Sequence, residues 1–220
     1  NSTITNNDAG GQGGGVNSSS NKSTTVSASI FSGNTAGTDG GGLYVASTNS
    51  TISGSTFSQN TAGTDGGGVY NNSWNATISG STFSQNTATG NGGGLFNNMY
   101  GIATATDDLF TGNTAANGGA VYNNGAITYD ETYIIDESTS PVSYEIIGTY
   151  AFHGGTFASN TATYTANTAT ENGGALFNAA LATLTGDLIT GNIAANGGAI
   201  YNKKTEEHEV FIEGIVYASG

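Results

Sequence analysis

A four-residue block recurs along the chain at a nearly constant interval, and it constrains the fold more than any other feature. Each copy has two Gly, then Gly or Ala, then an aliphatic residue, and successive copies start 27, 26, 26, 26, 55 and 24 residues apart. The copies are residues 13–16, 40–43, 66–69, 92–95, 118–121, 173–176 and 197–200. A repeat of this length is typical of solenoid proteins, in which each repeat contacts only its neighbours.

The local sequence favours strands over helices. Gly makes up 36 of 220 residues, and Gly is unfavourable inside helices. Short alternating segments such as residues 51–53 and 77–79 lie between clusters of Gly, Asn and Ser, which are strand and turn signals. Asn-Gly pairs such as 91–92 and 117–118 indicate positive φ. The sequence therefore predicts an all-β parallel β-helix of about seven coils.

Equivalent residues of successive coils should stack in ladders. The last residue of each block forms one inward ladder, and the aromatic residue that follows it should face outward and stay partly exposed. A second motif, aromatic-x-x-Asn, predicts an inward ladder at Phe31, Phe57, Phe83, Phe110, Phe157 and Ile189. Its Asn residues should form an amide ladder at a corner. These are Asn34, Asn60, Asn86, Asn113, Asn160 and Asn192.

The paired motifs resemble the repeat of the chlamydial-type polymorphic outer-membrane proteins. Residues 118–123 (Gly-Gly-Ala-Val-Tyr-Asn) and 110–113 (Phe-Thr-Gly-Asn) carry the resemblance most closely, and it covers about residues 10–123 and 152–202. The resemblance implies a right-handed, single-stranded β-helix in a secreted, extracellular or cell-surface protein. That family contains adhesins, so the resemblance also implies a structural or adhesive role.

Two interruptions and one non-repeat segment remain within a single domain, residues 1–220. A lateral insertion at about 124–150 contains two apolar segments, 133–135 and 144–147, which predict two strands. It is either a binding surface or a decorated turn. Residues 161–171 are polar, which predicts a loop. Residues 203–220 either cap the helix end or donate a strand to a neighbouring subunit. The residues of that strand are Val210, Phe211, Ile212, Ile215, Val216 and Tyr217.

Charge restricts the partners. The net charge is −13 with three cationic side chains. Nucleic acid and anionic membrane surfaces are therefore excluded as partners. No apolar run is long enough to insert into a membrane. There is no Cys, and the two His residues lack metal-ligand spacing, so we expect no metal and no cofactor. Asp39 and Asp65 are equivalent residues of neighbouring coils, and turn Asp is favoured there over a calcium site.

Two function classes follow. The first is a non-catalytic structural or adhesive module of a surface or filament protein. Such a module would associate end to end, with copies of itself or with neighbouring repeats. Its other expected partners are surface glycans or a host surface. The alternative is a carbohydrate-active enzyme that uses Asp108 and Asp187, which occupy the position of Ser29, Ser55 and Ser81 in other coils. A polysaccharide hydrolase needs paired carboxylates, whereas polar turn residues need no cleft.

Overall fold

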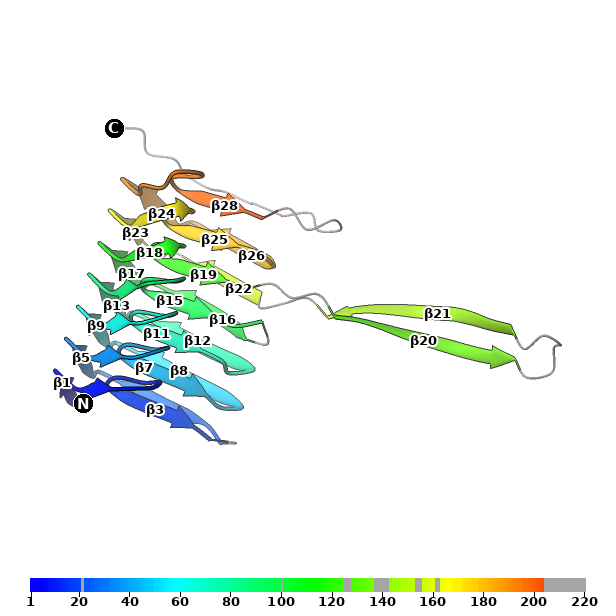
Figure 1. The fold of residues 1–220 in the computed structure, drawn as a ribbon, viewed down its shortest axis with the longest axis horizontal. Helices are drawn as coiled ribbons and strands as arrows, with labels where there is room; N and C mark the ends of the chain where they lie inside the picture. The colour runs from blue at the N-terminus through cyan, green and yellow to red at the C-terminus, as the bar shows by residue number, and fades with distance from the viewer. Residues whose placement is uncertain are drawn as a thin grey trace.

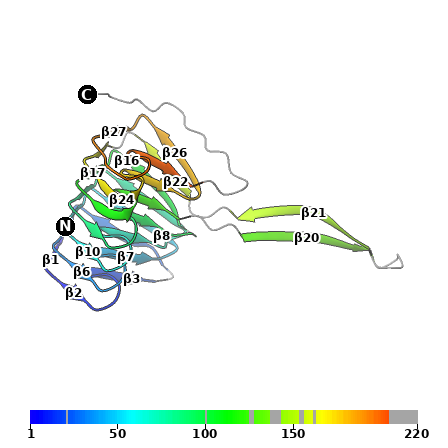
Figure 2. The same ribbon diagram turned by 45° about the horizontal axis from the view of Figure 1, so that its top comes forward.

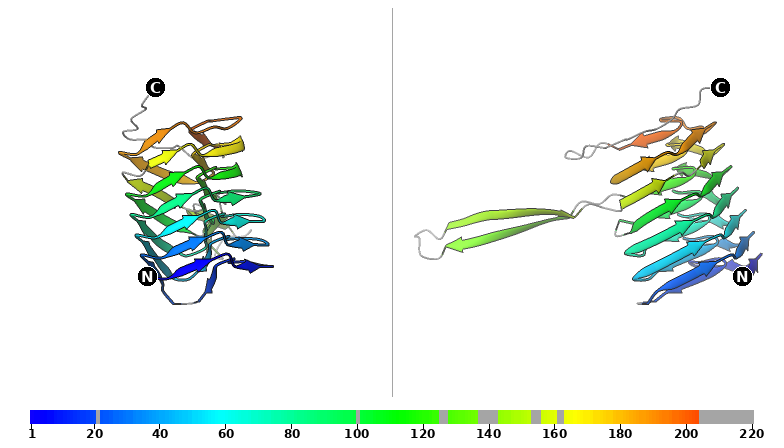
Figure 3. Two further views of the ribbon diagram at one scale, coloured as in Figure 1. Left: turned by 90° about the vertical axis from the view of Figure 1, so that its left-hand side faces the viewer. Right: turned by 180° about the vertical axis from the view of Figure 1, so that it is seen from behind.

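Parallel strands stacked in coils make up the computed structural model of the chain. The structure describes residues 1–20, 22–99, 101–124, 128–136, 143–152, 156–160 and 163–203. Each coil passes through four short strands in turn, and the coils follow one another along one axis (Figures 1 and 3). Within these residues the chain is all-β, as the sequence predicts.

Four parallel sheets, here named A to D in the order the chain visits them, form the walls of the stack. Sheet A contains β1 (Thr3–Thr5), β5 (Ile30–Ser32), β9 (Thr56–Ser58), β13 (Thr82–Ser84), β17 (Leu109–Thr111), β23 (Thr163–Thr165) and β27 (Leu188–Thr190). Sheet B contains β2 (Asp8–Ala9), β6 (Thr35–Ala36), β10 (Thr61–Ala62), β14 (Thr87–Ala88), β18 (Thr114–Asn117) and β24 (Thr168–Asn172).

The other two walls follow the same pattern. Sheet C contains β3 (Val16–Ser19), β7 (Leu43–Ala46), β11 (Val69–Asn71), β15 (Leu95–Asn97), β19 (Val121–Asn123), β25 (Leu176–Asn178) and β28 (Ile200–Asn202). Sheet D contains β4 (Thr24–Ser27), β8 (Asn49–Ser53), β12 (Asn75–Ser79), β16 (Ile102–Thr106), β22 (Thr156–Asn160) and β26 (Leu181–Thr185). Two sheets thus have seven strands and two have six.

The remaining two strands form a separate sheet. β20 (Thr128–Asp136) and β21 (Ser143–Phe152) pair antiparallel with each other, with a register shift between Thr132 and Tyr133. They lie in the connection from β19 in sheet C to β22 in sheet D, and the ribbon shows them beside the stack (Figures 1 and 2). They contain the two apolar segments for which the sequence predicts strands.

The core consists of side chains repeated in register from coil to coil. Phe57 pairs with Phe83 in sheet A, Val69 with Leu95 in sheet C, and Ile52 with Ile78 in sheet D. All of them are at most 2 % exposed. Because a single coil cannot cover its own apolar face, this burial depends on stacking, which is the main source of stability in a solenoid.

Stacked rings continue through the core of sheet A. The ring centroids of neighbouring residues lie 4.8, 5.1, 4.6 and 5.1 Å apart along Phe31, Phe57, Phe83, Phe110 and Tyr164. Tyr164, not the predicted Phe157, occupies the fifth position, and it pairs with Ile189. Phe157 lies in sheet D, where it pairs with Ala103 and Ala182.

The polar segment 161–171 is not simply the loop that its composition predicts. It contains β23 and the first residues of β24, which continue sheets A and B. Thr163 and Thr165 flank buried Tyr164, an alternation of outward and inward residues that suits a strand. Polarity misled the prediction because the outward positions of these sheets are Thr and Ser in most coils.

The aromatic residues of sheet C face away from the aliphatic ladder, as the alternation predicts, but several are more buried than expected. Tyr44, Phe96 and Phe177 are 8, 4 and 6 % exposed. The rings stack on one another at 4.5–5.3 Å and so cover each other's faces. Burial raises the pKa of Tyr70, and the nearby carboxylates of Asp39 and Asp65 act in the same direction.

Candidate functional site at the edge between sheets C and D

The corners of the stack differ in how much they vary. The connections from sheet D to sheet A and from sheet A to sheet B are two residues long in each coil that has both flanking strands. Many of these corners begin with a residue of positive φ, such as Gln59 (56°) or Asp107 (54°). Such uniform corners keep the neighbouring strands in register.

The connections from sheet B to sheet C are three or six residues long, and those from sheet C to sheet D vary far more. The connections from sheet C to sheet D, here called the C–D edge, are residues 20–23, 47–48, 72–74, 98–101, 124–155 and 179–180. They range from two residues to the long segment that contains β20 and β21. In repeat proteins, insertions that gather on one face often mark the binding face.

A buried amide ladder supports this variable edge. In this ladder, the Nδ2 group of each Asn donates a hydrogen bond to Oδ1 of its counterpart in the next coil. The members in order are Asn71, Asn97, Asn123, Asn178 and Asn202, and the successive bonds are 2.8, 2.9, 2.8 and 3.0 Å long. These residues end their strands in sheet C, and the first four are at most 1 % exposed. The edge can therefore change in length while the strand ends beneath it stay fixed.

A second row of amides lies on the edge itself. Nδ2 of Asn98 donates to Oδ1 of Asn72 at 2.9 Å, and Nδ2 of Asn124 donates to Oδ1 of Asn98 at 3.3 Å. Neither row is among the predicted ladders. The signal for the buried row is the tripeptide aliphatic-aromatic-Asn at 69–71, 95–97, 121–123, 176–178 and 200–202, and the signal for the second row is a further Asn directly after three of these tripeptides, at 72, 98 and 124.

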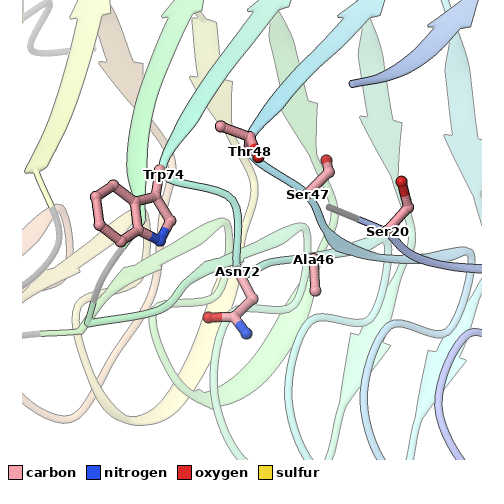
Figure 4. Close-up of a pocket in the computed structure, with 6 residues that line it drawn as sticks. All are labelled: Ser20, Ala46, Ser47, Thr48, Asn72 and Trp74. Carbon is pink, nitrogen blue, oxygen red and sulfur yellow. The ribbon is translucent and has the colours of Figure 1, made fainter. Parts of the chain in front are cut away.

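The C–D edge contains a cavity of about 370 Å³ lined by Ser20, Ala46, Ser47, Thr48, Asn72 and Trp74. Figure 4 shows Trp74 on one side and Ser20 on the other, with Ala46, Ser47 and Thr48 between them. Trp74 is 72 % exposed, the highest value among the exposed large hydrophobic side chains of the described residues. The lining combines one indole with hydroxyl and amide groups and contains no ionisable side chain.

The predicted Asn ladder lies at another corner, between sheets A and B. Asn34, Asn60, Asn86 and Asn113 are fully buried, and each donates from Nδ2 to Oδ1 of the next member at 2.9–3.0 Å. Each Oδ1 also accepts the backbone N–H of the preceding Asn, as Asn86 Oδ1 does from Asn60 N. These amides therefore continue the interstrand hydrogen bonding around the corner.

The fifth member of this ladder is Asn167, and the prediction of Asn160 is wrong. Asn113 donates to Asn167, and Asn167 donates to Asn192, at 3.0 and 2.9 Å. Asn160 ends β22 in sheet D, where it pairs with Thr106 and Thr185. The motif aromatic-x-x-Asn occurs twice in this coil, as Phe157/Asn160 and Tyr164/Asn167, and only the second occurrence is in register.

Asp108 and Asp187 are both 2 % exposed, in the corner between sheets D and A. Oδ1 of Asp108 accepts the backbone N–H of Ser81 at 2.7 Å, and Oδ2 accepts that of Thr106 at 3.0 Å. Ser55 and Ser81 accept equivalent bonds in their coils. Burial raises the pKa of Asp108 to about 7, despite these two hydrogen bonds. The enzyme alternative has no support here, because both carboxyl groups lie in the wall of the stack.

Asp65 also forms hydrogen bonds from one coil to the next at a corner. Its Oδ1 accepts both the backbone and the side-chain N–H of Asn91, at 2.8 and 2.9 Å. Burial raises its pKa, and the charge of Asp39 adds to that effect. Among the described residues, no group of three or more His, Cys, Asp or Glu could hold a metal ion.

Several predicted features lie outside the described residues. The assembly strand at Val210, Phe211, Ile212, Ile215, Val216 and Tyr217 belongs to this part, as do His153 and His208. Among the residues that are described, no helix has the length and apolarity needed to cross a membrane.

The four parallel sheets, the uniform corners and the buried ladders define a parallel β-solenoid repeat protein. Its coils are similar to the repeat of the Chlamydia polymorphic membrane proteins, because the family model of that repeat matches residues 28–46, 54–72, 80–98, 109–124 and 188–203. These matches confirm the predicted resemblance and relate the chain to a family of surface-associated, non-enzymatic proteins. No curated protein and no solved structure matches the chain significantly.

Proposed function

We propose that this chain is a non-catalytic, adhesive module of an extracellular surface or filament protein, and that its C–D edge is the adhesive surface. The observation that carries the proposal is that variation in length is concentrated at this edge while the corners on either side of sheet A stay constant. The repeat family supports a surface location. A rigid stack that presents variable loops along one edge suits adhesion, since each loop can change without disturbing the core.

A shortened corner tests this proposal. Replacing residues 124–155 with Ala-Ala, the sequence of the connection at 179–180, should leave the stack folded, since strands in other coils accept a two-residue connection. Protein-coated beads should then lose most of their adhesion to host cells, with an unchanged denaturation midpoint. A control variant, Thr61→Lys, changes an exposed residue of sheet B and should adhere as the wild type does. Full adhesion by the shortened variant would refute the proposal.

The non-catalytic part of the proposal has its own test. A panel of pectins, alginates and glucans should show no turnover by the purified chain. Turnover that disappears in Asp108→Asn would instead support the enzyme alternative.

We also propose that the chain associates end to end. Within the described residues, β1, β2, β3 and β4 each have a partner strand on one side only. The Asn ladders have a direction, because each Nδ2 donates toward the coil that follows. A second copy would therefore add head to tail, which gives an open filament rather than a closed pair. The apolar segment 210–217, for which the sequence predicts a strand, would make the contact.

Truncation tests the association. The full chain should form filaments visible by electron microscopy, and deletion of residues 205–220 should abolish them. A truncated protein that still polymerises, or a full-length chain that stays monomeric at high concentration, would contradict this part of the proposal.

A further inference from the structure

Trp74 is not required by the fold in which it sits. In the preceding coil its position is held by Thr48, since Asn75 pairs with Asn49 and Asn71 with Val45. The large aromatic side chains of the core are almost fully buried, whereas Trp74 is 72 % exposed. Leaving an indole in water forgoes the stabilisation that its burial would give. An exposed Trp beside a cavity therefore suggests a ligand that covers the ring.

The polar groups of this cavity are held in place before any ligand arrives. Asn98 donates to Oδ1 of Asn72, and the backbone N–H of Asn72 donates to the carbonyl of Val45 at 2.8 Å. The Ser47 hydroxyl donates to the carbonyl of Asn49 at 3.1 Å and lies 3.3 Å from Ser73 Oγ. Ser20 and Thr48 are exposed at the rim. Such preorganised groups reduce the entropic cost of binding.

The chemistry of the lining restricts the ligand. No cationic side chain lines the cavity, although Lys22 donates its backbone N–H to the lining Ser20 Oγ at 2.9 Å. Because the whole chain also carries a net charge of −13, an anionic ligand is disfavoured. A quaternary ammonium group is usually recognised by a cage of aromatic rings, and only one ring is present. What remains is a neutral ligand that has both an apolar face and many hydroxyl groups.

We propose that the cavity binds an uncharged carbohydrate. The C–H face of a sugar ring would pack on the indole of Trp74, while its hydroxyl groups would exchange hydrogen bonds with Asn72, Ser20 and Thr48. The volume of about 370 Å³ lies within the range of small-molecule sites. This inference rests on the proposed adhesive function, because it names the ligand class for one site on the C–D edge.

Tryptophan fluorescence reads the site directly, because Trp74 is the only Trp in the chain. Titration of the full chain with lactose, cellobiose, maltose and mannobiose should give a saturable change in emission for at least one of them. The anionic probes 3′-sialyllactose and galacturonate should give none. Emission that does not change with any neutral probe, or changes equally with the anionic ones, would overturn the proposal.

Variants test the two kinds of contact by calorimetry. Trp74→Ala should weaken binding of the neutral sugar at least ~10-fold, as truncation of a central aromatic contact does. Asn72→Ala should weaken it about fivefold, as loss of a hydrogen bond does. The control Ile193→Ala removes a side chain that is 64 % exposed outside the cavity and should bind normally. Equal affinity of Trp74→Ala and the wild type would refute the site.

The bead assay separates this inference from the proposed function. If coated beads adhere to cells but the titration shows no change with any neutral sugar, the carbohydrate site is wrong while the adhesive edge stands. If the beads do not adhere but the titration saturates and Trp74→Ala abolishes it, the site is right and the adhesive function fails.

Discussion

At the scale of single residues, buried Asn side chains act as substitutes for backbone. Asn86 donates to Asn113 Oδ1 and to the carbonyl of Phe57, and it accepts from both N–H groups of Asn60. A corner interrupts the ladder of backbone hydrogen bonds, and one amide side chain per coil restores it. This explains why a polar residue can be fully buried in the wall of the stack.

Removing one such amide should be costly. Asn86→Ala removes four hydrogen bonds and takes the Asn86 partner from the Asn60 N–H and the Phe57 carbonyl, whereas Asn113 Oδ1 keeps the Asn86 N–H and Asn60 Nδ2 keeps the Phe31 carbonyl. Each unpaired buried group costs on the order of 1–3 kcal/mol. We therefore expect the free energy of unfolding to fall by ~3 kcal/mol or more in chemical denaturation. Asn49→Ala, at an exposed residue, serves as the control and should change it by ~0.5 kcal/mol or less. An unchanged midpoint for Asn86→Ala would mean that the ladder contributes nothing to stability.

Asp108 should make stability depend on pH. Burial raises its pKa to about 7 in the folded protein, against about 3.9 in an unfolded chain. Between pH 3.9 and pH 7, Asp108 has already lost its proton in the unfolded chain but keeps it in the folded protein. The contribution of Asp108 to the free energy of unfolding is therefore complete at low pH and is lost as the pH rises toward 7. Within this window the effect is at most about 1.4 kcal/mol per pH unit.

The substitution Asp108→Ser isolates this effect, because Ser fills the same position as Ser55 and Ser81. The variant should gain stability relative to the wild type as the pH rises from 4 to 8, measured by denaturation at a series of pH values. Parallel curves for the two proteins would show that the carboxyl group is not protonated in the fold.

At the scale of the repeating elements, the Gly block permits a corner that a side chain would obstruct. A Cβ on Gly67 would clash with the carbonyl oxygen of Gly93 in the next coil. The preceding residue, Gly66, has a φ of 69°, a conformation that favours Gly. The block therefore reflects the close approach of one coil to the next.

A pair of matched substitutions tests this close approach. Gly67→Ala should separate neighbouring coils and destabilise the fold by about 3 kcal/mol, as overpacking does. Gly10→Ala places its Cβ in open space and should change stability by ~0.5 kcal/mol or less. Equal midpoints for the two variants, by thermal or chemical denaturation, would contradict the assigned geometry.

The period of the repeat predicted the fold and the aliphatic ladder, because stacking needs equivalent residues at equal spacing. It did not resolve the coil after the long connection, where Tyr164 and Asn167 were hidden by an earlier copy of the same motif. The cavity at Trp74 was also beyond the sequence, since its lining comes from three successive coils. Only the register of the coils shows that Ser20, Thr48 and Trp74 share one edge.

At the scale of the whole molecule, the stack separates stability from recognition. The core ladders and uniform corners keep the coils aligned, and the C–D edge varies on top of a fixed row of amides. The central claim is therefore that adhesion depends on this edge and not on the other faces.

Site-directed blocking measures this claim most directly, because the chain contains no Cys. Single Cys residues at Thr48 on the C–D edge, at Thr61 on sheet B and at Thr64 between sheets B and C are all exposed positions, and each can carry a polyethylene glycol chain. We expect bead adhesion to be lost when Thr48→Cys is labelled and retained when Thr61→Cys or Thr64→Cys is labelled. Adhesion that survives the label at position 48, or that all three labels reduce equally, would contradict it.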